Sequence, residues 1–258
     1  MQDGFGGQLK EWRQLRRMSQ MELALSAGVS SRHISFLETG RSRPSRGMVL
    51  RLCDELEMPR GARNQLLTAA GMAGAFESRA LSEAEMAPLQ EAMGWMLAQH
   101  TPYPAIALDR HWHLVEMNAP AQMMFQAAGI SVGDSMLDAF FDNAVLRGSI
   151  ENLAEVERLS LARLRTELAH FGRDSVLEAA ISRLHDAVAL DGDGDADGVR
   201  PAVIPARYRV GDAVLSLFST ISQFGATDDI AMAELRIEMF FPADEATRQV
   251  FFAMAGQG

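Results

Sequence analysis

Apolar residues recur at helical spacing from the start of the chain. In the stretch GGQLKEWRQLRRM they fall at Leu9, Trp12 and Leu15, which predicts a first amphipathic helix. Basic residues occupy its outer positions: Lys10, Arg13, Arg16 and Arg17. The pattern therefore predicts a helix with an apolar inner stripe and a basic outer face.

Further helices are predicted in close succession. Ser19 can cap a second helix, with Glu22 three residues later completing a capping box, and Gly28 can end it in the left-handed conformation. Ser30 caps a third helix. Two more amphipathic helices follow in MVLRLCDELEM and RGARNQLLTAAG, and we expect Pro44 in the first turn of the fourth helix.

The third helix has an unusual outer face. At about 100° per residue, with Ile34 at zero, Leu37 falls near 300° and the core direction is about 330°. Arg32 then lies at about 160°, Ser35 at about 100° and Phe36 at about 200°, all on the open side. A phenylalanine pointing outward beside an arginine is typical of a recognition surface, where it can contact a thymine methyl while the arginine contacts guanine.

The pattern changes after a small-residue stretch, AAGMAGAFESRA at 69–80, where we place the linker. A helix is predicted in 82–100, then two strands in YPAIALDRHWHLVEMN with a turn at Asp109 and Arg110. Helical segments fill 119–190. Three strand-like runs follow: AVIPARYRV, DAVLSLFSTISQF and AMAELRIEMFFP. We predict a multidomain chain, with an all-α five-helix domain at 1–70, a linker at 71–80 and an α+β domain at 81–258.

Composition and charge change this picture in one respect. Of the 258 residues, 48% are hydrophobic and 22% charged, as in soluble globular proteins, and no apolar run approaches the ~20 residues of a membrane helix. No secretory signal is visible, and the lone Cys53 allows no internal disulfide, so we expect a cytoplasmic protein. The net charge of −10 divides unevenly: residues 1–64 hold 11 basic and 7 acidic residues, and the remainder holds 13 and 27. A basic N-terminal segment precedes an acidic body, so the N-terminal segment can approach a polyanion if the body faces away.

The N-terminal segment resembles the lambda-repressor-like (XRE family) helix-turn-helix domain over residues 8–70. The resemblance rests on SQMELA, AGVS, the inward Ile34 and LETGRSRP. It implies DNA contacts from the start of the second helix, the recognition helix and the loop after it. Together with the outer face derived above, the candidates are Gln20, Ser30, Ser31, Arg32, Ser35, Phe36, Arg41 and Arg43, the last two as backbone contacts. An ordinary helical hairpin with a solvated basic face is the alternative.

The C-terminal part resembles a PAS-like sensor domain, with an antiparallel sheet of about five strands and helices. Three stretches are similar to the MmyB-like ligand-binding domain that follows an XRE helix-turn-helix in a group of bacterial regulators: YPAIALDRHWHLVEMNAPA, LSLFSTISQFGATDDIAMAEL and RIEMFFPADEAT. The resemblance implies a transcription factor whose PAS-like pocket holds a small apolar ligand. Fatty-acid-like ligands are associated with this domain.

The residues of the body permit such a pocket. Residues 81–258 hold ten methionines, whose flexible thioethers suit an adaptable apolar cavity. The candidate lining residues are Met93, Met96, Met117, Met124, Phe125, Phe140 and Phe218. For any single one of them, plain core packing is the favoured interpretation. Arg207 and Arg209 share one face of a strand and are candidates for a ligand's acidic head group, with a solvated or salt-bridged face as the alternative.

Other chemistry finds little support. DGDGDADG at 191–198 places carboxylates at calcium-loop spacing, but its twelfth position is Ile204 where a glutamate is required. His111 and His113 share a face of a predicted strand without a third ligand. We therefore predict no metal, no cofactor beyond a possible bound fatty acid, and no catalytic residue.

The main hypothesis is a non-enzymatic regulator that binds double-stranded DNA as a homodimer at a near-palindromic operator. A small ligand controls this binding, and we expect no membrane partner. Two alternatives stay open. One is an enzyme with unrecognised chemistry in the C-terminal cavity, and the other is an antitoxin-like protein-interaction module.

Overall fold

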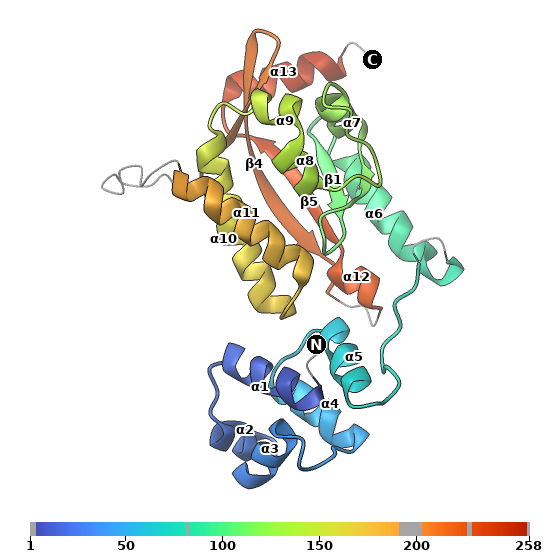
Figure 1. Cartoon of the computed structure of the whole chain (residues 1–258). Helices are drawn as coiled ribbons and strands as arrows, with labels where there is room; N and C mark the ends of the chain where they lie inside the picture. Colours follow the sequence, from blue (N-terminus) through green and yellow to red (C-terminus); the bar gives the residue numbers. More distant parts are fainter. Residues whose placement is uncertain (1–3, 81–82, 191–202, 226–228, 257–258) are drawn as a thin grey trace. The chain divides into compact units, whose positions relative to one another are not determined.

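A computed structural model describes residues 4–80, 83–190, 203–225 and 229–256 (Figure 1). By their internal contacts the residues divide into two compact units. The first comprises Met1–Ser78, Leu164–Glu178 and Asp228–Ile230, and the second comprises Arg79–Arg163, Ala179–Thr227 and Ala231–Gly258. No helix in the described ranges is long and apolar enough to cross a bilayer.

Five helices of the first unit lie before Ala70. They are α1 (Phe5–Leu15), α2 (Gln20–Ser26), α3 (Ser31–Glu38), α4 (Arg46–Glu55) and α5 (Arg60–Ala69). The predicted caps form: Ser19 and Glu22 make a reciprocal capping box, and the Ser30 hydroxyl accepts a hydrogen bond from the backbone N–H of His33. Pro44 lies before the N-cap Ser45 rather than in the first turn of α4, so that placement was wrong.

The core of these five helices is closely packed. Leu9, Leu23, Ile34 and Leu37 have no exposed surface, and Cys53 is buried among them. The inner stripe of α1 runs through Phe5, Leu9 and Trp12. Leu15, which we predicted to be inward, is 40% exposed, because Phe5 extends the stripe at the N-terminal end of the helix instead.

Beyond the first five helices the chain forms a sheet with helices before, between and after its strands; within these helices, Leu164–Glu178 and Ile230 belong to the first unit. The strands are β1 (Ala105–Leu108), β2 (Leu114–Met117), β3 (Ala206–Val210), β4 (Ala213–Gln223) and β5 (Arg236–Pro242). Before β3 the helices are η1 (Ala84–Met86), α6 (Ala87–Gln99), α7 (Ala119–Gln126), α8 (Met136–Asp142), α9 (Ala144–Ser149), α10 (Leu153–Phe171) and α11 (Ser175–Leu190). After β4 come α12 (Ile230–Glu234) and α13 (Glu245–Ala255).

Within the described residues the five strands form one antiparallel sheet in the order β2-β1-β5-β4-β3. β5 is central and pairs with β1 through Ile106 and Glu238, and with β4 through Ser219 and Phe240. The predicted fold, a five-helix domain followed by an α+β PAS-like domain, is confirmed.

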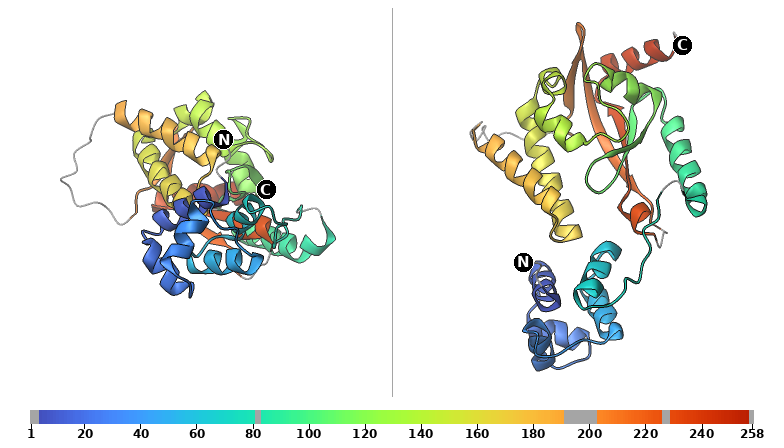
Figure 2. Two further views of the ribbon diagram at one scale, coloured as in Figure 1. Left: turned by 60° about the horizontal axis from the view of Figure 1, so that its bottom comes forward. Right: turned by 45° about the vertical axis from the view of Figure 1, so that its right-hand side comes forward.

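Both faces of the sheet are covered. Because side chains alternate along a strand, β1 sends Ala105 and Ala107 to one face and Ile106 and Leu108 to the other. The alanine face packs on α6, and the Ile106 face packs on α7, α8 and α9 (Figure 2).

Two predicted strand segments are not strands. AMAEL forms the short helix α12 followed by Leu235, and β5 starts only at Arg236. His111 and His113 lie in the turn between β1 and β2, because the Asp109 side chain accepts hydrogen bonds from the backbone N–H of both residues. Between them Trp112 adopts a left-handed φ of 65°.

Candidate functional site

The outer face of α3 carries the candidate DNA-contacting residues. Ile34 and Leu37 anchor the helix in the core, so its opposite side is solvent-facing. Ser30, Ser31 and Arg32 at its N-terminal end are exposed, and Ser35 and Phe36 are half-buried. The spacing of the inward pair thus positions the polar start of α3 for contact with a partner.

Phe36 lies within cation–π distance of two arginines. The Arg32 guanidinium carbon lies 5.1 Å from the centroid of the Phe36 ring, and that of Arg41 lies 6.0 Å from it. The backbone N–H of Arg41 also donates to the Phe36 carbonyl at 2.8 Å, which fixes the loop after α3 against the helix. Cation–π contacts at exposed sites are worth about 0.5–1 kcal/mol each. Both guanidinium groups therefore lie near the same aromatic ring at the outer face of α3.

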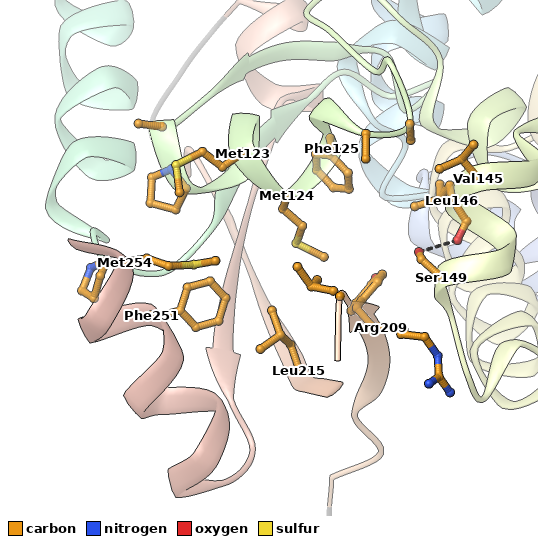
Figure 3. A pocket seen from close by; sticks show the side chains of 18 of the residues that line it. Met123, Met124, Phe125, Val145, Leu146, Ser149, Arg209, Leu215, Phe251 and Met254 are labelled. Carbon is orange, nitrogen blue, oxygen red and sulfur yellow. Dashed lines mark hydrogen bonds between the residues drawn. The ribbon is translucent and has the colours of Figure 1, made fainter. Parts of the chain in front are cut away.

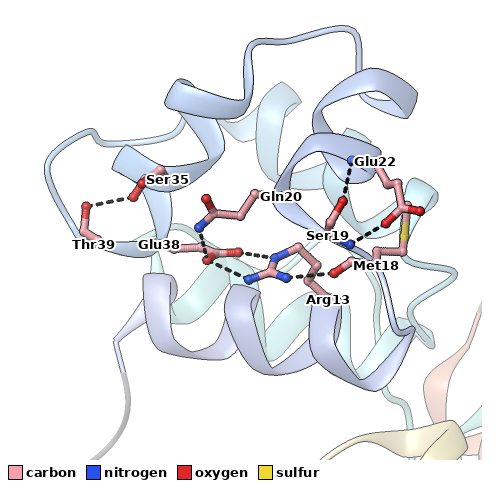
Figure 4. Close-up of polar contacts among 8 residues, drawn as sticks. All are labelled: Arg13, Met18, Ser19, Gln20, Glu22, Ser35, Glu38 and Thr39. Carbon is pink, nitrogen blue, oxygen red and sulfur yellow. Dashed lines mark hydrogen bonds and ion pairs between the residues drawn. The ribbon is translucent and has the colours of Figure 1, made fainter.

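A buried ion pair ties α1, α2 and α3 together (Figure 4). Arg13 Nε donates to Glu38 Oε1 at 2.6 Å and Arg13 Nη2 donates to Glu38 Oε2 at 3.0 Å, while Nη1 donates to the Met18 carbonyl at 2.7 Å. Gln20 Nε2 donates to Glu38 Oε2 at 2.8 Å. The candidate Gln20 is thereby fixed beside α3.

Sequence reasoning placed Arg13 on the outer face of α1, and the structure corrects this. Arg13 is 8% exposed and is directed towards α3. The sequence indicates the inward position of Arg13 through Glu38. On the same helical wheel Glu38 falls at about 40°, only about 70° from the core direction. A carboxylate so close to the core requires a buried cation, and Arg13 supplies it.

The loop between α3 and α4 carries the remaining candidates. Arg41 and Arg43 are exposed there, and no helix covers them. Their assignment as contacts to the DNA backbone stays a prediction.

The second unit contains an apolar cavity of about 370 Å³ between α7, α9, the β3–β4 hairpin and α13 (Figure 3). Its wall includes Met124 and Phe125 from α7, Leu146 from α9, Leu215 from β4 and Phe251 from α13. We call it the outer cavity. Its volume lies in the range of small-molecule sites.

A second cavity of about 230 Å³, the inner cavity, lies on the same face of the sheet, towards α8 and α10. Phe140 and Phe218 line it, as predicted candidates, together with Trp112 and Met136. Its wall also carries charged side chains, whereas the outer cavity is bordered mostly by apolar ones.

Three methionine candidates lie elsewhere. Met93 and Met96 belong to the cluster between α6 and the alanine face of the sheet, and Met117 packs in the core without lining either cavity. The reason is topological: α6 and α7 lie on opposite faces of one sheet, which their similar Met-rich composition does not reveal.

The two arginine candidates alternate with Tyr208 along β3 and so point to the opposite face. Arg207 is exposed and lines neither cavity. Arg209 lies at the rim of the outer cavity, where it forms an ion pair with Glu151, and its guanidinium points away from the cavity (Figure 3).

Residues that sequence reasoning missed come from β3 and the C-terminal helix. Tyr208 lines both cavities, and Phe251 and Met254 project from α13 into the wall of the outer one. The spacing of Phe251 and Met254 on one helical face was the available signal.

The described residues give no further support to the candidate metal sites. No cluster of three or more His, Cys, Asp or Glu residues suited to a metal occurs in the described ranges. The Asp/Gly stretch at 191–198 lies outside those ranges.

Comparison with known families gives two matches. The family described as the MmyB-like transcription regulator ligand binding domain matches residues 89–253. A helix-turn-helix domain family matches residues 5–66. A search among curated proteins finds no match.

Proposed function

We propose a ligand for this chain, which belongs to the MmyB-like transcription regulators and is therefore a DNA-binding regulator that senses a ligand. The ligand is an apolar, acyl-chain compound held in the outer cavity. We also propose that the protein acts as a homodimer on a near-palindromic operator. Ligand binding then changes the affinity for DNA.

The observation that carries the DNA-binding part is the cluster at the outer face of α3 formed by exposed Arg32, half-buried Phe36 and exposed Arg41 from the following loop. Arginine contacts guanine O6 and N7 in the major groove, and an apolar ring contacts a thymine methyl. In this proposal Arg32 contacts the base and Phe36 the adjacent methyl group. Gln20, Arg41 and Arg43 contact phosphates and set the register.

The apolar wall of the outer cavity supports an acyl chain as ligand. Met124, Phe125, Leu215 and Phe251 offer flexible or flat apolar surfaces, and each methylene buried there contributes about 0.8 kcal/mol. Affinity is therefore expected to rise about fourfold for each added methylene until the cavity is filled.

The homodimer follows from the size of the recognition element. α3 has 8 residues, and one such helix reads too few bases to select a site in a genome. Two copies on half-sites about one helical turn apart supply the missing specificity. The ligand changes this binding only if its affinity differs between the DNA-bound and free conformations.

The DNA assignment is tested by selecting binding sites from a random duplex pool with the full chain. Arg32→Ala is expected to cost about 1–3 kcal/mol on the selected site and to relax preference at one position of each half-site. Arg43→Ala is the matched control. It is expected to weaken binding uniformly across sequences and to lower the number of counterions released on binding by about one. Equal, sequence-independent losses from both variants would contradict the assignment.

The ligand assignment is tested on the protein as purified. Native mass spectrometry followed by solvent extraction is expected to release an acyl compound. A protein that carries none and also fails to bind acyl-chain probes in calorimetry would overturn this part of the proposal.

A further inference from the structure

The inner cavity differs from the outer one in its chemistry. Its wall includes Glu238 of β5, Arg163 of α10 and Ser219 of β4. The two cavities share the side chains of Phe125, Leu146 and Tyr208. An apolar space and a polar space thus adjoin on one face of the sheet.

The charges in the inner cavity balance each other. Glu238 is 8% exposed; its Oε2 accepts from Arg163 Nη1 at 2.9 Å, and its Oε1 accepts from the Ser219 hydroxyl at 2.6 Å. Trp112 lies over the Arg163 guanidinium, with 4.1 Å from the guanidinium carbon to the ring centroid. The carboxylate and the guanidinium therefore form a neutral pair with fixed geometry.

Tyr208 lies at the boundary of the two spaces. Burial raises the pKa of its phenol, and repulsion from the Glu238 carboxylate raises it further. The phenol therefore keeps its proton at neutral pH and is a hydrogen-bond donor. Its position is set by the backbone, since β3 pairs with β4 at Leu215 and bridges to Ile150.

We infer that the two cavities form one site for an amphiphile whose chain occupies the outer cavity and whose head is an uncharged hydrogen-bonding group, such as a hydroxyl or amide, that contacts Tyr208 and Glu238. This inference rests on the proposed acyl-chain ligand and adds the chemistry of its head. A hydroxyl accepts a hydrogen bond from Tyr208 and donates one to the carboxylate of Glu238.

A carboxylate head is disfavoured at this position. It would place a second negative charge beside Glu238 with Arg163 already engaged, and two neighbouring carboxylates resist joint ionisation. The rim offers no better anchor, because Arg209 is paired with Glu151 and directed away from the cavity. The site therefore selects against free fatty acids.

The test compares two probes of equal chain length, 1-decanol and decanoate, by calorimetry on the delipidated full chain at about pH 8, where decanoate is ionised. The wild type is expected to bind 1-decanol about tenfold more tightly than decanoate. Glu238→Gln removes the like charge and is expected to reverse this preference. Glu151→Gln, at the rim, is the matched control and is expected to leave it unchanged.

A second variant keeps the test independent of how Glu238→Gln folds. Tyr208→Phe is expected to weaken 1-decanol binding by about threefold to tenfold, because one hydrogen bond is lost, and to leave decanoate binding unchanged. If wild type and all variants bind both probes equally, the inference about the head is overturned while the acyl-chain proposal stands. If decanoate binds more tightly and Glu151→Gln increases its affinity, the head lies at the rim and the inference is overturned. If neither probe binds, the proposed function fails and the inference fails with it.

Discussion

Similar apolar residues play different roles in the five N-terminal helices and in the sheet domain. In the helix-turn-helix, Leu9, Leu23, Ile34 and Leu37 are fully buried in the core, and the candidate DNA-contacting side chains face outward. In the α+β domain, apolar side chains surround cavities of about 370 and 230 Å³, so the candidate ligand-binding surface faces inward.

Domain size explains this difference. A small domain buries a smaller fraction of its surface, so each apolar side chain is needed for stability. A larger domain with a sheet covered on both faces gains enough burial to leave one face incompletely filled. An apolar pattern therefore predicts which residues are buried. The size of the domain decides whether those residues fill a core or line a cavity.

The largest effect is expected at the ion pair that supports the filled core. Glu38→Ala leaves Arg13 buried without its carboxylate and is expected to lower the free energy of unfolding by about 3–5 kcal/mol. Urea denaturation followed by tryptophan fluorescence measures it, with Trp95 and Trp112 replaced by phenylalanine so that Trp12 alone reports. Asp54→Ala, which removes an ion pair with Arg63 from a 65% exposed side chain, is the control and should cost less than about 1 kcal/mol. Similar losses from both variants would show that the Arg13–Glu38 pair is not a buried support.

A larger side chain introduced into each region distinguishes the core of the first unit from the cavity of the second. Ala24→Leu, at a position 2% exposed in α2, is expected to destabilise by about 1–3 kcal/mol, because the core has no room for it. Ala128→Leu, at the wall of the outer cavity, is expected to leave stability unchanged or to raise it slightly. Thermal unfolding of both variants measures this. Equal destabilisation would mean that the cavity is not available space.

The dry environment of the first core has a pH signature. Burial raises the pKa of the Cys53 thiol from 9.0 to about 12. Below pH 9 both states are protonated, whereas above pH 9 the unfolded chain loses the proton first. Stability is therefore expected to fall by about 1 kcal/mol between pH 9 and pH 10.

Unfolding by urea across that pH range measures the fall, and Cys53→Ala is expected to flatten it. If wild type and variant show the same slope, burial of Cys53 does not control it.

The smallest effect is expected on the outward surface. Phe36→Leu keeps an apolar contact but removes the ring that Arg32 and Arg41 both contact, and is expected to weaken operator binding by about 0.5–1 kcal/mol. Fluorescence anisotropy with the selected duplex measures it, with unfolding free energy as the control. A loss as large as that of Arg32→Ala would mean that Phe36 itself determines the contact.

Local signals in the sequence predicted much of the first unit. The Ser19–Glu22 capping box, the Ser30 cap and the inward pair Ile34 and Leu37 all form as expected, because each depends on neighbours within four residues. Arg13 was misplaced because its partner Glu38 lies 25 residues away on another helix.

The second unit was less predictable in its site than in its fold. Strand alternation predicted the sheet, and Phe125 and Met124 line the outer cavity as expected. The positions of Met93 and Met96 on the other face depend on which side of the sheet α6 packs. Such a choice is made by tertiary packing and leaves no periodic signal in the sequence.

The central claim is that occupancy of the outer cavity controls binding by the outward face of α3. The most direct test is the dissociation constant of the full chain for its selected duplex, with and without saturating 1-decanol, for wild type and Ala128→Leu. We predict a change of about fivefold or more for the wild type and a smaller one for Ala128→Leu, whose added side chain occupies part of the cavity. An unchanged constant for the wild type, with 1-decanol shown by calorimetry to be bound, would contradict the claim.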